Sequence, residues 1–183
     1  MKPTNKQLAT VIFFILFLSM IPAANYTLLH FGTSCPANEP CVIPVWFSPV
    51  IYAPSGVLFA GLALVLRDIL QRLAGLYLAL IAVVIGTILS YLYVNPALAL
   101  AGCSAYFLSE MTDTIVYSFL QKYNLILAVL VSASFGVVID STVFLHLAFH
   151  SYEFIGGQII GKFWMVLLSI PLIKFARSRL NYI

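Results

Sequence analysis

The sequence predicts an all-α, polytopic integral membrane protein with six transmembrane helices and with the N- and C-termini in the cytoplasm. Three observations predict this fold class. Of the 183 residues, 62% are hydrophobic and only 8% are charged, and the mean hydropathy of +1.05 is far from that of soluble domains. Apolar runs long enough to cross a bilayer recur along the chain. Lys and Arg residues gather in alternate connections between these runs.

Six apolar runs are expected to form one transmembrane domain that spans residues 1–183. A helix needs about 20 apolar residues to cross a bilayer. The runs lie near residues 8–28, 50–71, 75–94, 97–120, 125–149 and 157–176. The first run is longer than the apolar region of a signal peptide, and Pro22-Ala23-Ala24-Asn25-Tyr26 is a poor cleavage site. We therefore expect the first run to remain as a helix.

The orientation follows from the basic residues, because cytoplasmic loops carry an excess of them. The loops at residues 30–46, 94–96 and 150–156 contain no Lys or Arg. The basic residues at the chain ends and in the other connections are Lys2, Lys6, Arg67, Arg72, Lys122, Lys174, Arg177 and Arg179. Both termini are therefore predicted to be cytoplasmic. The net charge of +3 reflects this bias, and we expect no nucleic-acid partner.

The first outward loop contains Cys35 and Cys41. On the predicted topology it faces an oxidising compartment, so a disulfide between them is expected, with two free thiols as the alternative. The segment that follows, residues 44–56, is broken by prolines. It is interpreted as an ordinary interfacial loop, with a re-entrant or half-helical segment as the alternative.

Six charged residues lie inside the apolar runs, where a charge costs about 2.5–3.5 kcal/mol at a helix centre. They are Arg67, Asp68, Glu110, Asp113, Asp140 and Lys162. Arg67 is interpreted, like Arg72, as extending to the cytoplasmic surface. Lys162 is expected to neutralise a carboxylate of the fourth or fifth helix. A purely structural buried ion pair is the alternative.

The fourth helix carries the most specific local pattern. Glu110, Asp113, Thr114 and Tyr117 project from one side of it, which cannot face lipid comfortably. The segment Asp140-Ser141-Thr142-Val143-Phe144 echoes Asp113-Thr114-Ile115-Val116-Tyr117 on a helix of opposite direction. Such an echo is what an inverted repeat around a midplane binding site would leave.

Two other patterns bear on cofactors and energy source. His146 and His150 have a spacing compatible with metal ligation, and Glu153 follows, but we interpret the three as an interfacial cluster. We expect no metal and no cofactor. The sequence contains no Walker A loop, so the driving force would be an ion gradient, intracellular trapping or a partner ATPase.

Four separated polar motifs follow one another along the chain. They are Asp68-x-x-x-Arg72-x-x-Gly75, the Asp113 segment with Glu110 before it, the run Ser134-Phe135-Gly136-Val137-Val138-Ile139-Asp140-Ser141, and Lys162 before a last helix that contains Ile170-Pro171. In their order and spacing these motifs resemble those of the vitamin uptake transporter (VUT) family. The resemblance extends from about residue 50 to residue 172. The chain differs in its short length, its cysteine-bearing loop and its sparse loop charge.

The best known members of this family are queuosine precursor transporters of bacteria, so the resemblance implies an importer of 7-cyano-7-deazaguanine or a related deazapurine in the bacterial inner membrane. Carboxylates can accept the neighbouring N–H and amine of such a ring, and aromatic side chains can stack on it. The candidate substrate-binding residues are Asp140, Asp113, Glu110, Asp68, Lys162, Tyr117, Phe135 and Phe144. Gly156, Gly157 and Gly161 form a small-residue patch that would suit a homodimer contact.

Three alternatives stay open. The chain could be the substrate-capture subunit of an ATP-driven vitamin importer, with residues 56–63 as a docking segment. It could be an intramembrane aspartyl-type enzyme, although no Gly-x-Gly-Asp surrounds either aspartate. It could also be a structural protein without a ligand. We expect a transporter and no enzymatic activity.

Overall fold

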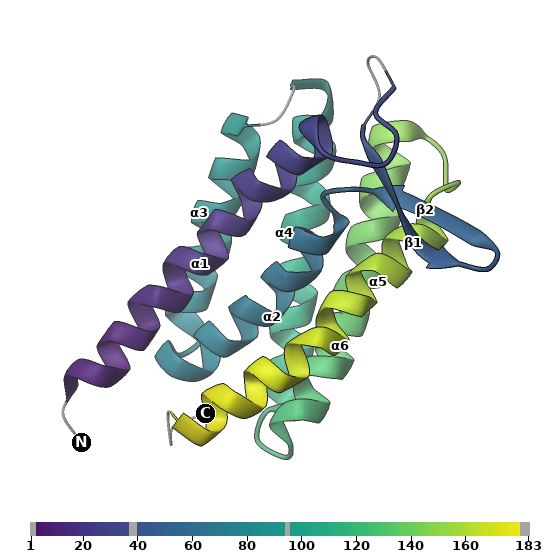
Figure 1. The fold of residues 1–183 in the computed structure, drawn as a ribbon. Coiled ribbons are helices and arrows are strands. Elements are labelled where there is room, and N and C mark those ends of the chain that lie inside the picture. Colours follow the sequence, from purple (N-terminus) through teal and green to yellow (C-terminus); the bar gives the residue numbers. More distant parts are fainter. Residues whose placement is uncertain (1–2, 37–39, 94–95, 180–183) are drawn as a thin grey trace.

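The computed structural model describes residues 3–36, 40–93 and 96–179. In this part of the chain, six helices and one β-hairpin follow one another (Figure 1). They are α1 (Pro3–His30), β1 (Val42–Phe47), β2 (Val50–Pro54), α2 (Val57–Ala74), α3 (Leu76–Tyr93), α4 (Pro96–Leu120), α5 (Leu125–Phe149) and α6 (Ile155–Arg179). Each predicted apolar run contains one helix. The second helix begins at residue 57 and not near residue 50, because residues 50–54 form β2.

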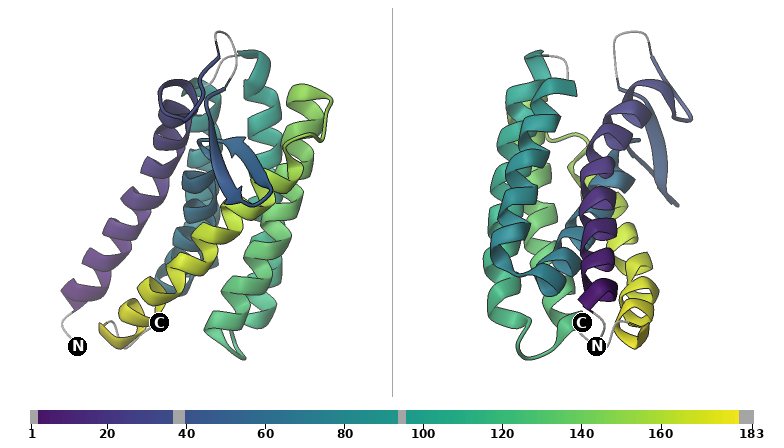
Figure 2. Two further views of the ribbon diagram at one scale, coloured as in Figure 1. Left: turned by 45° about the vertical axis from the view of Figure 1, so that its right-hand side comes forward. Right: turned by 90° about the vertical axis from the view of Figure 1, so that its left-hand side faces the viewer.

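Helix α2 lies at the centre of the bundle and contacts each of the other five helices. In Figure 2, α3, α4 and α5 lie on one side of it, and α1 and α6 lie on the other. Gly75 separates α2 from α3 with a φ of 86°, a conformation that favours glycine. The Asn124 side chain begins α5 by accepting hydrogen bonds from the backbone N–H groups of Ile126 and Leu127, as an N-cap residue does.

The hairpin between α1 and α2 is antiparallel, and Val42 pairs with Pro54. It lies against α6 (Figure 2). The indole N–H of Trp164 donates to the Val45 carbonyl at 3.1 Å, and its ring stacks on Trp46 at 6.2 Å between centroids. Residues 44–54 are therefore neither a re-entrant helix nor an irregular loop.

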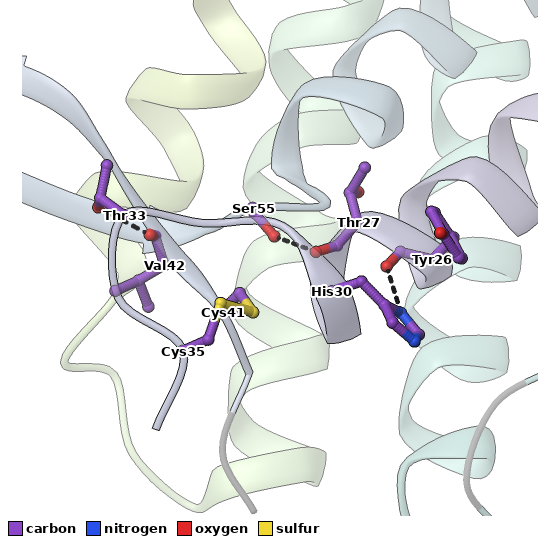
Figure 3. Close-up of a disulfide and its surroundings, with 8 residues drawn as sticks. All are labelled: Tyr26, Thr27, His30, Thr33, Cys35, Cys41, Val42 and Ser55. Atoms are coloured by element: carbon purple, nitrogen blue, oxygen red, sulfur yellow. Dashed lines mark hydrogen bonds between the residues drawn. A yellow bond between two sulfur atoms is a disulfide. The ribbon is translucent and has the colours of Figure 1, made fainter. Parts of the chain in front are cut away.

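The loop before the hairpin is tied to the ends of α1 and α2 (Figure 3). Cys35 and Cys41 form a disulfide. The Thr33 hydroxyl donates to the Val42 carbonyl at 3.0 Å, and the Ser55 hydroxyl donates to the Thr27 carbonyl at 2.7 Å. These contacts hold the hairpin over one end of the bundle.

The surface of the bundle is rich in large apolar side chains, and several charged side chains are buried, which differs from a typical soluble protein. Large apolar side chains such as Ile15, Leu100 and Leu168 are 60–70% exposed, whereas the Arg67 and Asp68 side chains have no exposed surface. Exposed apolar surface of this extent is expected where lipid covers the protein. The chain therefore has the character of a membrane protein.

Two segments of the described residues are long and apolar enough to cross a membrane by length and composition, Lys6–His30 and Leu125–Ala148. In an 18-residue apolar window of each segment, 17% and 39% of the residues are buried, so protein does not fully enclose either helix. Helix α1 begins and α6 ends at the same end of the bundle, away from the hairpin (Figure 1).

Candidate functional site

The first polar cluster of the interior surrounds Arg67. Its guanidinium donates from Nε to Glu110 Oε2 and from Nη1 to Asp68 Oδ1, both at 2.8 Å. Nη2 binds Asp113 Oδ2 and the Glu110 carbonyl, and Nη1 also reaches Gln71 Oε1 at 3.3 Å. We call Arg67, Asp68, Glu110 and Asp113 the Arg67 cluster. It joins α2 to α4, and all four side chains are at most 1% exposed.

A second layer of hydrogen bonds supports the Arg67 cluster. The Ser132 hydroxyl donates to Asp68 Oδ2 at 3.3 Å, which brings α5 into the network. The Gln71 amide donates to the Ser118 hydroxyl at 2.8 Å, and Ser118 donates to the Thr114 carbonyl. Gly136 of α5 allows a close approach, because a Cβ there would lie 3.2 Å from Asp113 Cβ.

The second cluster joins α5 to α6 around Lys162. Its ammonium binds Asp140 Oδ2 and donates to Gln158 Oε1 at 2.8 Å and to Ser141 Oγ at 3.0 Å. These contacts use the three donors of an ammonium group. Lys162 is 2% exposed and Asp140 is 20% exposed. We call these two residues the Lys162 pair.

Gly61 of α2 makes room for the Lys162 pair. A Cβ at Gly61 would lie 2.8 Å from both the Cα and the carbonyl oxygen of Lys162, closer than real Cβ contacts come. Any larger residue would push α2 and α6 apart, so the sequence needs glycine here to place Lys162 inside the bundle.

Two small cavities adjoin the Lys162 pair. The lower cavity has a volume of about 100 Å³, and Glu110, Tyr106, Phe59, Asp140 and Lys162 are among its lining residues. The upper cavity has a volume of about 130 Å³ and extends toward the hairpin end, where Leu28 and Pro54 line it. Both cavities are lined by Ala24, Asn25, Ala60, Asp140 and Lys162. The Lys162 pair therefore stands at the boundary between them.

The structure separates the candidate binding residues into three groups. Asp140, Lys162, Glu110 and Phe144 line one or both cavities. Asp68, Asp113 and Tyr117 are fully buried and line neither cavity. Phe135 lies on the outside of α5 and is 54% exposed.

Two aromatic side chains that sequence reasoning did not favour, Phe59 and Tyr106, line the lower cavity. Asn25 of α1 also lines both cavities, and it was not predicted as a binding residue. The signal that could have found it is an amide side chain within the apolar stretch of residues 11–29. Such a residue normally faces the interior of a bundle.

The expectation that Arg67 extends to the membrane surface is wrong. Its side chain has no exposed surface and is bound by three carboxylates from two helices. Arg72, which is also near the end of α2, is exposed. Lys162 does bind a carboxylate of the fifth helix, Asp140.

The two aspartates of the sequence echo occupy opposite halves of the bundle. Asp113 lies toward the end of α4 at the α4–α5 turn, and Asp140 lies beyond the middle of α5 in the opposite direction. Each binds a basic residue from another helix, Arg67 or Lys162. They do not bind each other, whereas an aspartyl enzyme needs two carboxyl groups that share a proton.

The glycine-containing segments that were considered as docking surfaces pack mostly against other segments of the same chain. A Cβ at Gly157 would lie 2.0 Å from the Tyr52 carbonyl oxygen, and one at Gly161 would lie 2.8 Å from the Val57 side chain. A Cβ at Gly56 would lie 2.7 Å from the Ala24 carbonyl oxygen. Only Gly156 of the helix-six patch is open. These glycines therefore support neither a homodimer contact nor a partner-docking segment at residues 56–63.

The histidines behave as a surface cluster. His146 Nδ1 lies 3.0 Å from the Tyr152 hydroxyl, within hydrogen-bonding distance, and the His146 and His150 rings meet edge to face. Among the residues that the structure describes, no group of three or more His, Cys, Asp or Glu side chains is arranged to hold a metal ion.

Residues 90–176 match a protein family whose model is described as "Putative vitamin uptake transporter". The match includes α4, α5 and almost all of α6, and therefore Glu110, Asp113, Asp140 and Lys162. It is slightly shorter than half of the chain and does not reach Arg67. No curated protein and no solved structure matches the chain. The match supports the resemblance to the VUT family and is consistent with a role in transport.

Proposed function

We propose that this chain imports 7-cyano-7-deazaguanine or a related deazapurine across the bacterial inner membrane, as a secondary transporter with six spanning helices and cytoplasmic termini. The similarity of residues 90–176 to vitamin uptake transporters supports import of a small solute. The distribution of Lys and Arg supports the orientation. The common end of α1 and α6 supports an even number of crossings.

The observation that carries the proposal is the charged lining of the lower cavity. Glu110, Asp140 and Lys162 reach it from three different helices inside an apolar-surfaced bundle. A deazaguanine ring offers an N–H and an exocyclic amine side by side to a carboxylate, and its carbonyl oxygen accepts from an ammonium. Charge-assisted hydrogen bonds of this kind are stronger than neutral ones.

The uncharged lining suits a flat heterocycle. The Tyr106 hydroxyl is buried and has no hydrogen-bond partner among the described residues, so a bound solute can satisfy it. Phe59 and Tyr106 supply aromatic faces in the lower cavity, and Phe144 supplies one in the upper cavity. Stacking on such faces is favourable for a planar ring.

Asp140 is our main candidate for recognition. It is 20% exposed and lines both cavities. We therefore expect its carboxylate to contact the solute in the upper cavity and again in the lower one. Glu110 contributes a second carboxyl group to the lining of the lower cavity. Asp68 and Asp113 bind Arg67, which in turn binds Glu110. These two aspartates and the buried Tyr117 are supporting residues in this proposal.

Binding must widen the cavities, because ligand pockets usually begin at about 300 Å³ and neither cavity exceeds about 130 Å³. The upper cavity leads toward the hairpin end, which the predicted topology turns outward. We infer that the solute enters there and passes the Lys162 pair. Helices α1 and α6 then move relative to α4 and α5 to open the opposite end.

The test is uptake of labelled 7-cyano-7-deazaguanine by cells that cannot synthesise it. The intact chain is compared with Asp140→Asn and with Thr142→Ala, whose hydroxyl donates only within α5, at matched membrane expression. We expect uptake by the intact chain and by Thr142→Ala and its loss in Asp140→Asn. Equal uptake by both variants would refute the carboxylate site. No uptake by the intact chain would refute the deazapurine substrate.

A further inference from the structure

The Arg67 cluster contains more acid than base. One guanidinium is surrounded by three carboxylates, Asp68, Glu110 and Asp113, all at most 1% exposed. If every group were ionised, two negative charges would be left without compensation inside the membrane domain. Like charges at hydrogen-bonding distance from one common partner disfavour joint ionisation, and an uncompensated buried charge is costly.

Buried hydroxyls beside the cluster are also unsatisfied. Tyr117 is fully buried and Thr114 is 3% exposed, and neither hydroxyl has a hydrogen-bond partner among the described residues. Asp113 Oδ1 is likewise buried without a hydrogen-bond partner among the described residues. An ionised carboxylate can only accept a hydrogen bond, whereas a protonated carboxyl can also donate one. Protonation of one carboxyl of the cluster would therefore supply a donor where a carboxylate oxygen is unmatched.

Glu110 is the member of the cluster that meets the cavity. It lines the lower cavity, and Asp68 and Asp113 do not. Its Oε2 is bound to Arg67 Nε at 2.8 Å. A proton can therefore reach the cluster from the solute pathway through Glu110. The charged and titratable groups that face Glu110 from the packed helices are Arg67 and Asp68 of α2, Tyr106 and Asp113 of α4, Asp140 of α5 and Lys162 of α6.

We propose that the Arg67 cluster is a proton-binding site and that its exchangeable proton, carried on Glu110, crosses the membrane together with the solute. A hydronium ion on the outer side gives one proton to the Glu110 carboxylate and becomes water. The solute then binds, and after the opposite end opens the carboxyl gives the proton to inner water, which becomes hydronium. The emptied carboxylate returns to the outward-facing state. Carboxylates in such positions serve as proton relays in transporters.

The Lys162 pair explains why Asp140 binds the solute while Glu110 carries the proton. Asp140 faces one ammonium that it neutralises, so its charge is balanced and it can remain an acceptor for the solute. Glu110 shares its guanidinium with two other carboxylates. The surplus proton therefore belongs to the Glu110 side of the cavity. This inference rests on the proposed function, because coupling requires a moving solute.

The transport test uses purified protein in vesicles with labelled 7-cyano-7-deazaguanine. The intact chain is compared with Glu110→Gln, whose amide oxygen still accepts from Arg67, and with Thr112→Val, a change at a hydroxyl that donates only within α4. An outwardly acidic pH gradient should make the intact chain and Thr112→Val accumulate the solute. Glu110→Gln should lose accumulation, and any exchange that its altered site still supports should no longer respond to the pH gradient.

Accumulation by Glu110→Gln equal to that of the intact chain would overturn the role of Glu110. Exchange by the intact chain that ignores the pH gradient would overturn proton coupling while leaving the transporter proposal in place. Absence of all exchange by the intact chain would overturn the deazapurine substrate instead.

A second measurement needs no solute. Infrared difference spectra of the purified protein between acidic and alkaline buffers should contain a protonated-carboxyl band that Glu110→Gln lacks and Thr112→Val retains. The same band in Glu110→Gln would contradict a proton on Glu110.

Discussion

The Arg67 cluster and the Lys162 pair are both buried ionic contacts between helices, but their charges are balanced differently. Arg67 is enclosed by three carboxylates with no exposed surface on its side chain. Lys162 binds one carboxylate, and that carboxylate is 20% exposed at a cavity. The first cluster cannot lose its cation without leaving several buried charges. The second is neutral and accessible, which suits a group that exchanges partners with a solute.

The largest expected effect is that of Arg67→Met. It leaves three carboxylates facing one another, and breaking a buried ion pair costs about 3–5 kcal/mol. Lys162→Met should cost less, because Asp140 retains some exposure. Thermal unfolding in detergent, with Arg72→Gln as the exposed control, should rank Arg67→Met below Lys162→Met and leave the control unchanged. Equal losses for the two buried cations would contradict the comparison.

The next prediction is that a second substitution restores stability to different extents at the two clusters. Adding Asp140→Asn to Lys162→Met removes both members of a pair, so the double variant should recover stability relative to Lys162→Met, since an unpaired buried charge costs more than an absent pair. Adding Asp113→Asn to Arg67→Met should recover less, because Asp68 and Glu110 remain. Complete recovery of the Arg67 variant by one substitution would show that its carboxylates do not act as a group.

Glycine substitutions provide a graded test of the close approaches beside each cluster. A Cβ at Gly61 meets Lys162 main-chain atoms at 2.8 Å, one at Gly136 meets Asp113 Cβ at 3.2 Å, and one at Gly156 meets nothing within 4 Å. Alanine at Gly61 should cost about 1–3 kcal/mol, as overpacking does. Alanine at Gly136 should cost less, and alanine at Gly156 should have no packing cost. A different order in unfolding temperature would contradict the packing at the Lys162 pair.

The last prediction concerns a region remote from both clusters, where we expect no effect on uptake. Replacing Cys35 and Cys41 by serine removes a bridge of sequence separation 6, and a loop of that length predicts a loss of about 2 kcal/mol. Neither cysteine lines the two cavities, so uptake per folded molecule should stay unchanged. A loss of uptake at full expression would mean that the hairpin loop takes part in solute admission.

The apolar runs predicted where the six helices lie, because an apolar run of about 20 residues is typical of a membrane helix. The hairpin was missed because its prolines were weighed above the Val, Ile, Trp and Tyr residues of 42–53, which are typical of strands. Arg67 was misplaced because its position near a helix end indicated a surface, whereas the carboxylates that hold it come partly from another helix.

Other features depended on partners that one helix cannot reveal. The alignment of Glu110, Asp113 and Tyr117 on one side was visible from their spacing, but only the fold decides that Glu110 meets a cavity and Tyr117 does not. Glycines of α6 suggested a contact between molecules. In the structure, Gly157 and Gly161 pack against the hairpin and α2. This contact was not predicted because the hairpin itself was not predicted.

The most direct test of the central claim is protection of a cavity residue by the solute. Ala60 lines both cavities beside the Lys162 pair, and Ser151 is exposed at the hairpin end. Ala60→Cys and Ser151→Cys, each with Cys103→Ser, are labelled by a membrane-impermeant maleimide with and without 7-cyano-7-deazaguanine. We expect the solute to slow labelling at position 60 and to leave position 151 unaffected. Rapid labelling of position 60 that the solute does not change, in protein that transports it, would place the binding site elsewhere.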